Sequence, residues 1–208
     1  MTQKCYKVMN WSTAAKHRIR NGLCSPDGSA HEIARIPLND PRTSPALKKK
    51  KIKVEYLYLD LKTCDRCIDS HEALDRVMET LTPALELAGY TVEYQKMEMD
   101  TAEKAEQYRF LSSPTIRVNG HDIGGHVRES NCSCCSKISN TQVDCRVFEY
   151  EGEKYEVPPE TMLAEAILKK GLLPQAKEES SAYVMPQNLK NFYKGKAEKQ
   201  NNCGSNGC

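Results

Sequence analysis

The 208-residue sequence has no apolar run of about 18 residues, so it predicts no segment that spans a membrane. Its first residues also lack the apolar stretch of a secretory signal, and we therefore expect a cytoplasmic protein. The chain contains no glycine-rich nucleotide-binding motif, no evident hydrolytic triad and no internal repeat. These absences argue against nucleotide-dependent enzymes, hydrolases and solenoid proteins.

Cysteine, in contrast, is abundant for a protein of a reducing compartment. Where thiols are kept reduced, closely spaced cysteines indicate metal or redox sites before structural disulfides. The ten cysteines are Cys5, Cys24, Cys64, Cys67, Cys132, Cys134, Cys135, Cys145, Cys203 and Cys208.

Charge is unevenly distributed along the chain, although the formal net charge is only +2. Basic residues exceed acidic ones by 8 in residues 1–51 and by 2 in residues 176–208, whereas acidic residues are in excess by 8 in residues 52–175. The basic N-terminal segment is expected to be a solvated arm; the alternatives are that it folds back on the acidic domain or meets an acidic partner. Its basic residues are not interleaved with aromatic ones, so no nucleic-acid partner is predicted.

Composition divides the chain into three parts. We predict a basic and irregular N-terminal extension over residues 1–51 and a single domain over residues 52–171, with a cysteine-rich insertion at 121–145. Residues 172–208 are polar and predict a flexible tail that ends in a cysteine pair. The scattered apolar residues of 183–193 leave open that this tail docks on a partner or on its own domain.

Hydrophobic patterns within the domain alternate between those of strands and helices. The expected order is strand, helix, strand, helix, strand, hairpin and helix, which predicts an α/β sandwich with a mixed central sheet. Asp100 is the expected N-cap of the second helix, and residues 121–140 read as a loop. The strands and the hairpin are expected at 53–61, at 91–99, after Pro114 and at 145–157, and the helices from Cys64 to Gly89, at 101–111 and from Pro159 to Gly171.

The pair Cys64-Asp-Arg-Cys67 lies where the first strand ends and the first helix begins. Unpaired backbone N–H groups and the positive end of the helix dipole favour a thiolate at that position. A lowered pKa makes such a sulfur a nucleophile and a metal ligand. We therefore expect Cys64 to be the more exposed, attacking thiol and Cys67 to resolve the mixed disulfide. Asp65 opposes thiolate formation, whereas Arg66 favours it.

The strand, the cysteine pair, the helix and the later Ser113-Pro114 together resemble the thioredoxin fold. In that fold a cis proline starts the strand beside the cysteine pair. The resemblance therefore implies a cis bond before Pro114 and a catalytic site made of Cys64, Cys67 and Pro114. The residues between the cysteines differ from the Gly-Pro of thioredoxin, and the tryptophan before the pair is absent, which argues against a general protein-disulfide reductase.

More narrowly, residues 52–171 resemble an uncharacterised thioredoxin-like family of cysteine-rich prokaryotic proteins that is catalogued only as a domain of unknown function. This resemblance supports the fold and implies no settled activity. The stretches that carry it are the first strand with Cys64 and Cys67, residues 112–120, residues 132–135, and Cys145 with the helix that follows Pro158-Pro159.

A second cluster of cysteines follows in the insertion. Cys132, Cys134, Cys135 and Cys145 supply four sulfurs within fourteen residues, which suits tetrahedral zinc or another soft ion such as Cu(I), Hg(II) or trivalent arsenic. If the strand after Pro114 returns toward the cysteine pair, Cys64 and Cys67 join the same site. The alternative is a structural zinc site that the insertion closes by itself. Three histidines are possible nitrogen ligands or ordinary surface residues: His71, His121 and His126.

Three functions remain open from the sequence. The first is a thioredoxin-like thiol-disulfide oxidoreductase that needs no cofactor and meets a thiol or disulfide substrate or a redox partner protein. The second is a soft metal or metalloid (Zn, Cu, Hg, As) binding or detoxification protein that uses the clustered thiolates. The third is a zinc-stabilised interaction module. The position of the cysteine pair favours the oxidoreductase, which we take as the first expectation, and the number of cysteines favours metal binding.

Overall fold

The structure, a computed structural model, describes residues 50–173 and 182–205, with side chains described up to residue 201. The described residues all belong to one compact unit. The predicted N-terminal extension lies outside them, as do Cys5, Cys24, Cys208 and the side chain of Cys203. Among the described helices, none combines the length and the apolar composition that crossing a bilayer requires.

The central sheet is mixed, as predicted. Its four strands are β1 (Lys50–Tyr58), β2 (Tyr90–Glu98), β3 (Thr115–Val118) and β4 (His121–Asp122), in the order β2-β1-β3-β4. Strand β1 runs parallel to β2 and antiparallel to β3, and β3 forms a hairpin with β4. The turn of that hairpin places Asn119 and Gly120 at positive φ, which glycine and asparagine adopt more readily than other residues.

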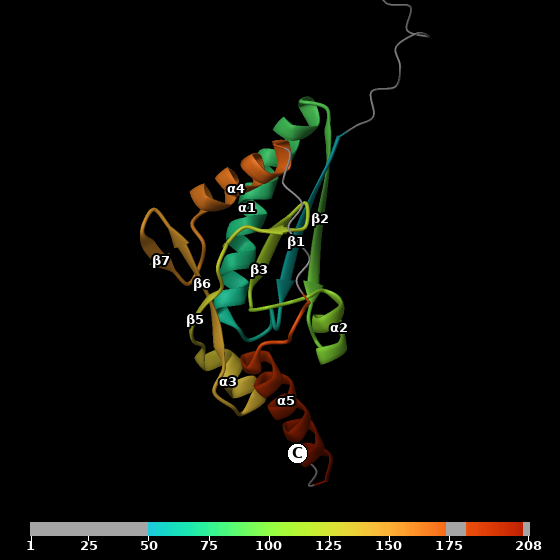
Figure 1. Cartoon of the computed structure of the whole chain (residues 1–208), viewed down its shortest axis with the longest axis vertical. Coiled ribbons are helices and arrows are strands. Elements are labelled where there is room, and N and C mark those ends of the chain that lie inside the picture. The colour runs from blue at the N-terminus through green and yellow to red at the C-terminus, as the bar shows by residue number, and fades with distance from the viewer. Residues whose placement is uncertain (1–49, 174–181, 206–208) are drawn as a thin grey trace, which may run out of the picture. The chain divides into compact units, whose positions relative to one another are not determined.

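Within residues 50–173 and 182–205, five helices accompany two sheets. Helix α1 (Asp65–Leu87) follows β1, α2 (Ala102–Gln107) follows β2, and α4 (Glu160–Leu172) follows the last strand. Helices α1 and α4 pack on the central sheet (Figure 1), where the buried side chains of Val54, Leu74 and Leu163 contribute to one apolar core. This order of elements is compatible with a thioredoxin-like sandwich.

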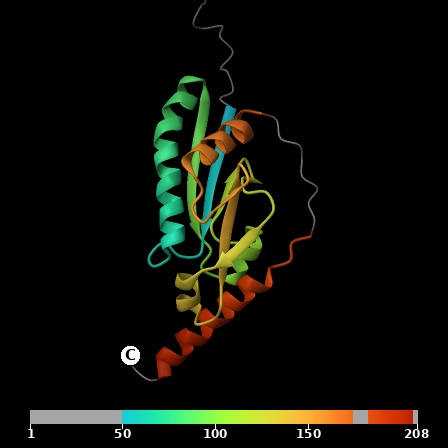
Figure 2. The ribbon, with the colours of Figure 1, turned by 90° about the vertical axis from the view of Figure 1, so that its left-hand side faces the viewer.

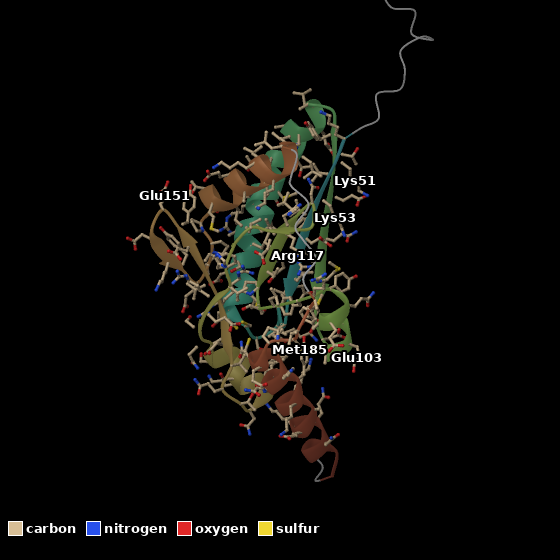
Figure 3. The ribbon with its side chains drawn as sticks, viewed as in Figure 1. Lys51, Lys53, Glu103, Arg117, Glu151 and Met185 are labelled. Carbon is tan, nitrogen blue, oxygen red and sulfur yellow. The ribbon has the colours of Figure 1, made fainter. Side chains whose placement is uncertain are left out.

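A second, antiparallel sheet contains β5 (Arg128–Asn131), β6 (Asp144–Tyr150) and β7 (Glu153–Tyr155) in that order. The predicted hairpin is confirmed, since β6 and β7 meet at Glu151 and Gly152, both at positive φ. Glu151 marks the tip of this hairpin in Figure 3. The amide of Arg146 on β6 donates to the carbonyl of Ser113 at 2.7 Å, which joins the second sheet to the loop before β3.

Three predictions about local structure are wrong. Residues 121–140 contain β4, β5 and α3 (Ser133–Ser139) instead of a loop, because β5 forms only through its long-range pairing with β6. Thr101, not Asp100, is the N-cap of α2, and its hydroxyl accepts a hydrogen bond from the amide of Lys104 at 3.2 Å.

The third wrong prediction is the flexible tail, because much of it forms helix α5 (Gln187–Ser205). The alternative that its apolar residues dock on the domain is confirmed. Met185, Leu189 and Phe192 are buried in a second apolar core, and Figure 2 shows α5 beside α3 at one end of the unit. Met185, labelled in Figure 3, lies on the chain that enters α5.

Candidate metal centre

Four cysteines meet in the second apolar core, although the first and the last are 81 positions apart in the chain. The Sγ atoms of Cys64, Cys132, Cys135 and Cys145 all lie within 4.8 Å of one another, and all four residues are buried. The Sγ of Cys64 is 3.9 Å from that of Cys132 and 3.7 Å from that of Cys135, and the Sγ of Cys145 is 3.4 Å from that of Cys135. None of the four forms a disulfide, so the group presents free thiols.

Two of the four cysteines lie at the N-termini of helices α1 and α3. Cys64 is the N-cap residue of α1, directly after the loop that leaves β1, and Cys132 is the N-cap residue of α3. Neither side chain makes a capping hydrogen bond, which leaves each sulfur available to other partners. Cys135 lies one turn into α3, on the side that faces the core.

The pairing of β5 with β6 supplies the fourth sulfur. Cys145 lies on β6 opposite Ser130, and Cys132 continues the ladder because its amide donates to the carbonyl of Val143 at 2.9 Å. The Ser136 hydroxyl closes this turn, since it accepts from the amide of Val143 at 2.9 Å and donates to the carbonyl of Cys132 at 2.8 Å. The insertion is therefore folded so that three of its four cysteines face one point.

The remaining predicted site residues lie beside the group. The Sγ of Cys67 is 3.3 Å from the Ser113 hydroxyl, which in turn accepts from the amide of Leu59 at 3.1 Å. Pro114 follows, it is buried, and the bond before it is cis as the resemblance implied. Cys134 is only partly buried, and its thiol points to the carboxylate of Asp65 at 3.8 Å.

The expectation that Cys64 is exposed is wrong. It has no exposed surface, because it packs in one apolar core with residues of α3 and α5, while its role as the attacking thiol stays a prediction. The histidines also lie apart from the four sulfurs. His71 pairs with Asp75 at 3.3 Å and contacts the ring of Tyr56, while His121 and His126 belong to β4 and the loop after it.

The pKa values of the four thiols are shifted in different directions. Hydrogen bonds from Cys132 and Cys135 hold the pKa of Cys64 below its ordinary value, and the hydrogen bond with Cys135 lowers the pKa of Cys132 to about 7. The pKa of Cys145 is raised by its hydrogen bonds with Cys132 and Cys135 and by burial. A thiolate at Cys64 is thus stabilised by protonated neighbours, and ionising all four buried sulfurs requires a cation among them.

Helix α5 completes the shell around the sulfurs, and sequence reasoning assigned it no part in the site. Leu189 and Phe192 belong to the same buried core as the cysteines. The side-chain amide of Asn188 forms two hydrogen bonds with the backbone of Asp144, the residue before Cys145, at 3.0 and 2.6 Å. The spacing of the apolar residues over 185–192 was the available signal, but it does not reveal which surface they cover.

Comparison with known proteins identifies a family without an assigned function. Residues 52–167 match a family described as a domain of unknown function (DUF2703). The match contains all four clustered cysteines and ends before α5. No curated protein and no solved structure matches the chain.

Proposed function

The chain belongs to the DUF2703 family, whose description assigns no activity, and we propose that it binds one soft metal ion between Cys64, Cys132, Cys135 and Cys145. Four thiolates are the ligand set of tetrahedral zinc sites, so Zn²⁺ is the ion that this arrangement favours.

The separation of the sulfurs carries this proposal. A zinc–sulfur bond of about 2.3 Å makes each edge of a tetrahedron of sulfurs about 3.8 Å long. Three of the six separations among the four sulfurs are 3.4, 3.7 and 3.9 Å, close to that value, and all six are within 4.8 Å. The side chains are thus arranged to receive a tetrahedral ion without a large change of backbone.

The surroundings of the sulfurs also suit a closed site. Structural zinc sites use all four positions for protein ligands, whereas catalytic zinc sites keep one position for water or substrate. Here the four sulfurs are all buried, which favours an ion held by protein ligands alone. Cu(I), Hg(II) and trivalent arsenic remain candidates by the softness of the ligands, but they prefer fewer sulfurs around the ion.

Elemental analysis of protein purified under reducing, anaerobic conditions tests the proposal. We expect one ion per chain, and we expect Cys135→Ser and Cys145→Ser each to lower the bound fraction strongly. Cys134→Ser is the matched control, because this neighbouring thiol lies outside the four-sulfur group and should leave the stoichiometry unchanged. Wild-type protein without metal, both as purified and after incubation with Zn²⁺, would refute the proposal.

Thiol-disulfide exchange is the second candidate function, supported by the surroundings of Cys67. This thiol lies three residues after Cys64, at the start of α1, and contacts Ser113 next to Pro114, as the thioredoxin-like interpretation expects. Turnover of a small disulfide substrate by the purified, reduced protein tests this function. The reducing cytoplasm that we expect for this protein would keep the pair in its dithiol form. Loss of turnover in Cys67→Ser, with metal content unchanged, would support exchange at this pair in addition to metal binding.

A further inference from the structure

Arg66 connects the cysteine pair to the second sheet. This residue lies between Cys64 and Cys67, yet its side chain turns away from solvent and is only 8% exposed. Its Nη1 donates to the carbonyl of Cys145 at 3.0 Å, and its Nη2 lies 3.4 Å from the carbonyl of Asn131. The same guanidinium forms an ion pair with Glu156, just after β7.

These contacts reach every segment that supplies a sulfur. Arg66 itself is two residues from Cys64 on α1, the carbonyl of Asn131 immediately precedes Cys132, and the third contact is the carbonyl of Cys145. Two further contacts, of 3.4 and 3.5 Å, reach the neighbouring carbonyls of Arg146 and Ser130. The planar guanidinium of Arg66 therefore fixes the spacing between α1 and the β5–β6 pair.

We propose that Arg66 is a positioning residue of the metal centre, which holds the Cys64 segment and the Cys132 and Cys145 segments at the separation that one ion requires. This inference rests on the proposed metal-binding function. It differs from the expectation that Arg66 tunes the thiolate of the cysteine pair by charge alone, because its hydrogen bonds go to backbone carbonyls of the ligand segments.

The charge of the guanidinium adds a second contribution. Four thiolates around a divalent ion leave the centre with a net negative charge, and a buried cation beside it offsets that charge. The neighbouring carbonyls and Glu156 pair with the two terminal nitrogens of the guanidinium, whereas its buried Nε has no hydrogen-bond partner among the described residues. Lysine supplies the same charge but cannot reach two separate carbonyls in one plane, so the two contributions can be separated by substitution.

A purely structural role for Arg66 makes a different prediction. If the Arg66 side chain only stabilised the packing of α1 on the second sheet, an Arg66 variant would lose no more metal affinity than another variant that is destabilised by the same amount. Val54→Ala provides that comparison, because it creates a cavity in the other core, away from the sulfurs. Arg76→Gln is the matched arginine control on the same helix, since Arg76 pairs with Glu160 at 2.6 Å and contacts no cysteine segment.

The test is metal affinity of the reduced full chain, measured by competition of a chelator for Zn²⁺ and from the thiolate charge-transfer bands of the Co²⁺-substituted protein. Replacing residues that orient metal ligands lowers affinity by about 10–100-fold, and we expect a loss of this size for Arg66→Gln. Arg66→Lys should lose less, and Arg76→Gln and Val54→Ala should bind as wild type does. We also expect the Co²⁺ bands to change shape in both Arg66 variants and in neither control.

The outcomes separate the two proposals. Wild-type protein that binds neither ion refutes metal binding itself. Wild-type protein that binds, together with Arg66 variants as tight as Arg76→Gln, overturns the role of Arg66 alone. If Arg66→Gln does not fold, Arg66→Lys decides. If neither folds, Glu156→Gln decides, because it removes the ion pair that holds the guanidinium: a Zn²⁺ affinity lower than that of Arg76→Gln supports the inference, and an equal affinity overturns it.

Discussion

Gly195 of α5 lies against Ser139 of α3 so closely that a Cβ on the glycine would come 2.2 Å from the Ser139 carbonyl oxygen. The methyl group of Thr141 would lie at 2.6 Å from the same Cβ. Helix α5 therefore reaches the cysteine core only because this position has no side chain.

Gly195→Ala should destabilise the protein by about 1–3 kcal/mol, because the added methyl group meets backbone that cannot move aside. Helix propensity alone predicts the opposite sign, since alanine is favoured over glycine within a helix by about 1 kcal/mol. Urea unfolding of the reduced protein decides between them. Gly171→Ala in α4 is the control, because its Cβ would meet only side-chain atoms of Ile52, from 3.1 Å, and should be nearly neutral.

Phe192→Ala should loosen the cover over the sulfurs. The ring is fully buried among the cysteine-containing core, and its truncation is expected to cost about 3–5 kcal/mol of stability. We expect the buried thiols to react faster with a thiol reagent in the variant than in wild type under native conditions. Val184→Ala is the control, as this side chain is 72% exposed. Equal rates in the Phe192 variant and the wild type would contradict the role of α5 as a cover.

Removal of the metal should lower the melting temperature and expose reactive thiols. Because a buried ion that binds only the folded protein stabilises it by mass action, the shift should grow with the free metal concentration. Thermal melts with and without a chelator, each at several Zn²⁺ concentrations, measure this shift in melting temperature.

Metal binding should also weaken as the pH falls from about 8 to about 5.5, since protons compete with the ion for the sulfurs. A melting temperature that is independent of metal and pH would be inconsistent with an ion in the core.

Asp122→Asn should destabilise the junction between the two sheets. Its carboxylate pairs at 2.6 Å with Arg146, whose side chain has no exposed surface. The Asp122 side chain is 25% exposed, but the Arg146 charge stays buried and loses its ion partner, so the expected cost is about 1–3 kcal/mol. The comparison is Asp100→Asn, which breaks a solvent-exposed pair with Lys104 and should cost much less stability. Chemical unfolding that ranks the two variants alike would contradict this account.

Much of the fold follows from local patterns. The apolar strand before Cys64, the helix after it and the hairpin within 145–157 are each specified by neighbouring residues, and the structure confirms them. The sequence also indicates the chemistry, because cysteines at this density and at a helix start are soft, ionisable ligands wherever they fold.

Only the tertiary structure decided which sulfurs belong together. Cys64 joins Cys132, Cys135 and Cys145, while Cys67 turns to Ser113 and Cys134 stays at the surface. That selection depends on the pairing of β5 with β6, on the contacts of Arg66 and on the docking of α5. Each of these joins residues far apart in the chain, and spacing along the sequence carries no information about such contacts.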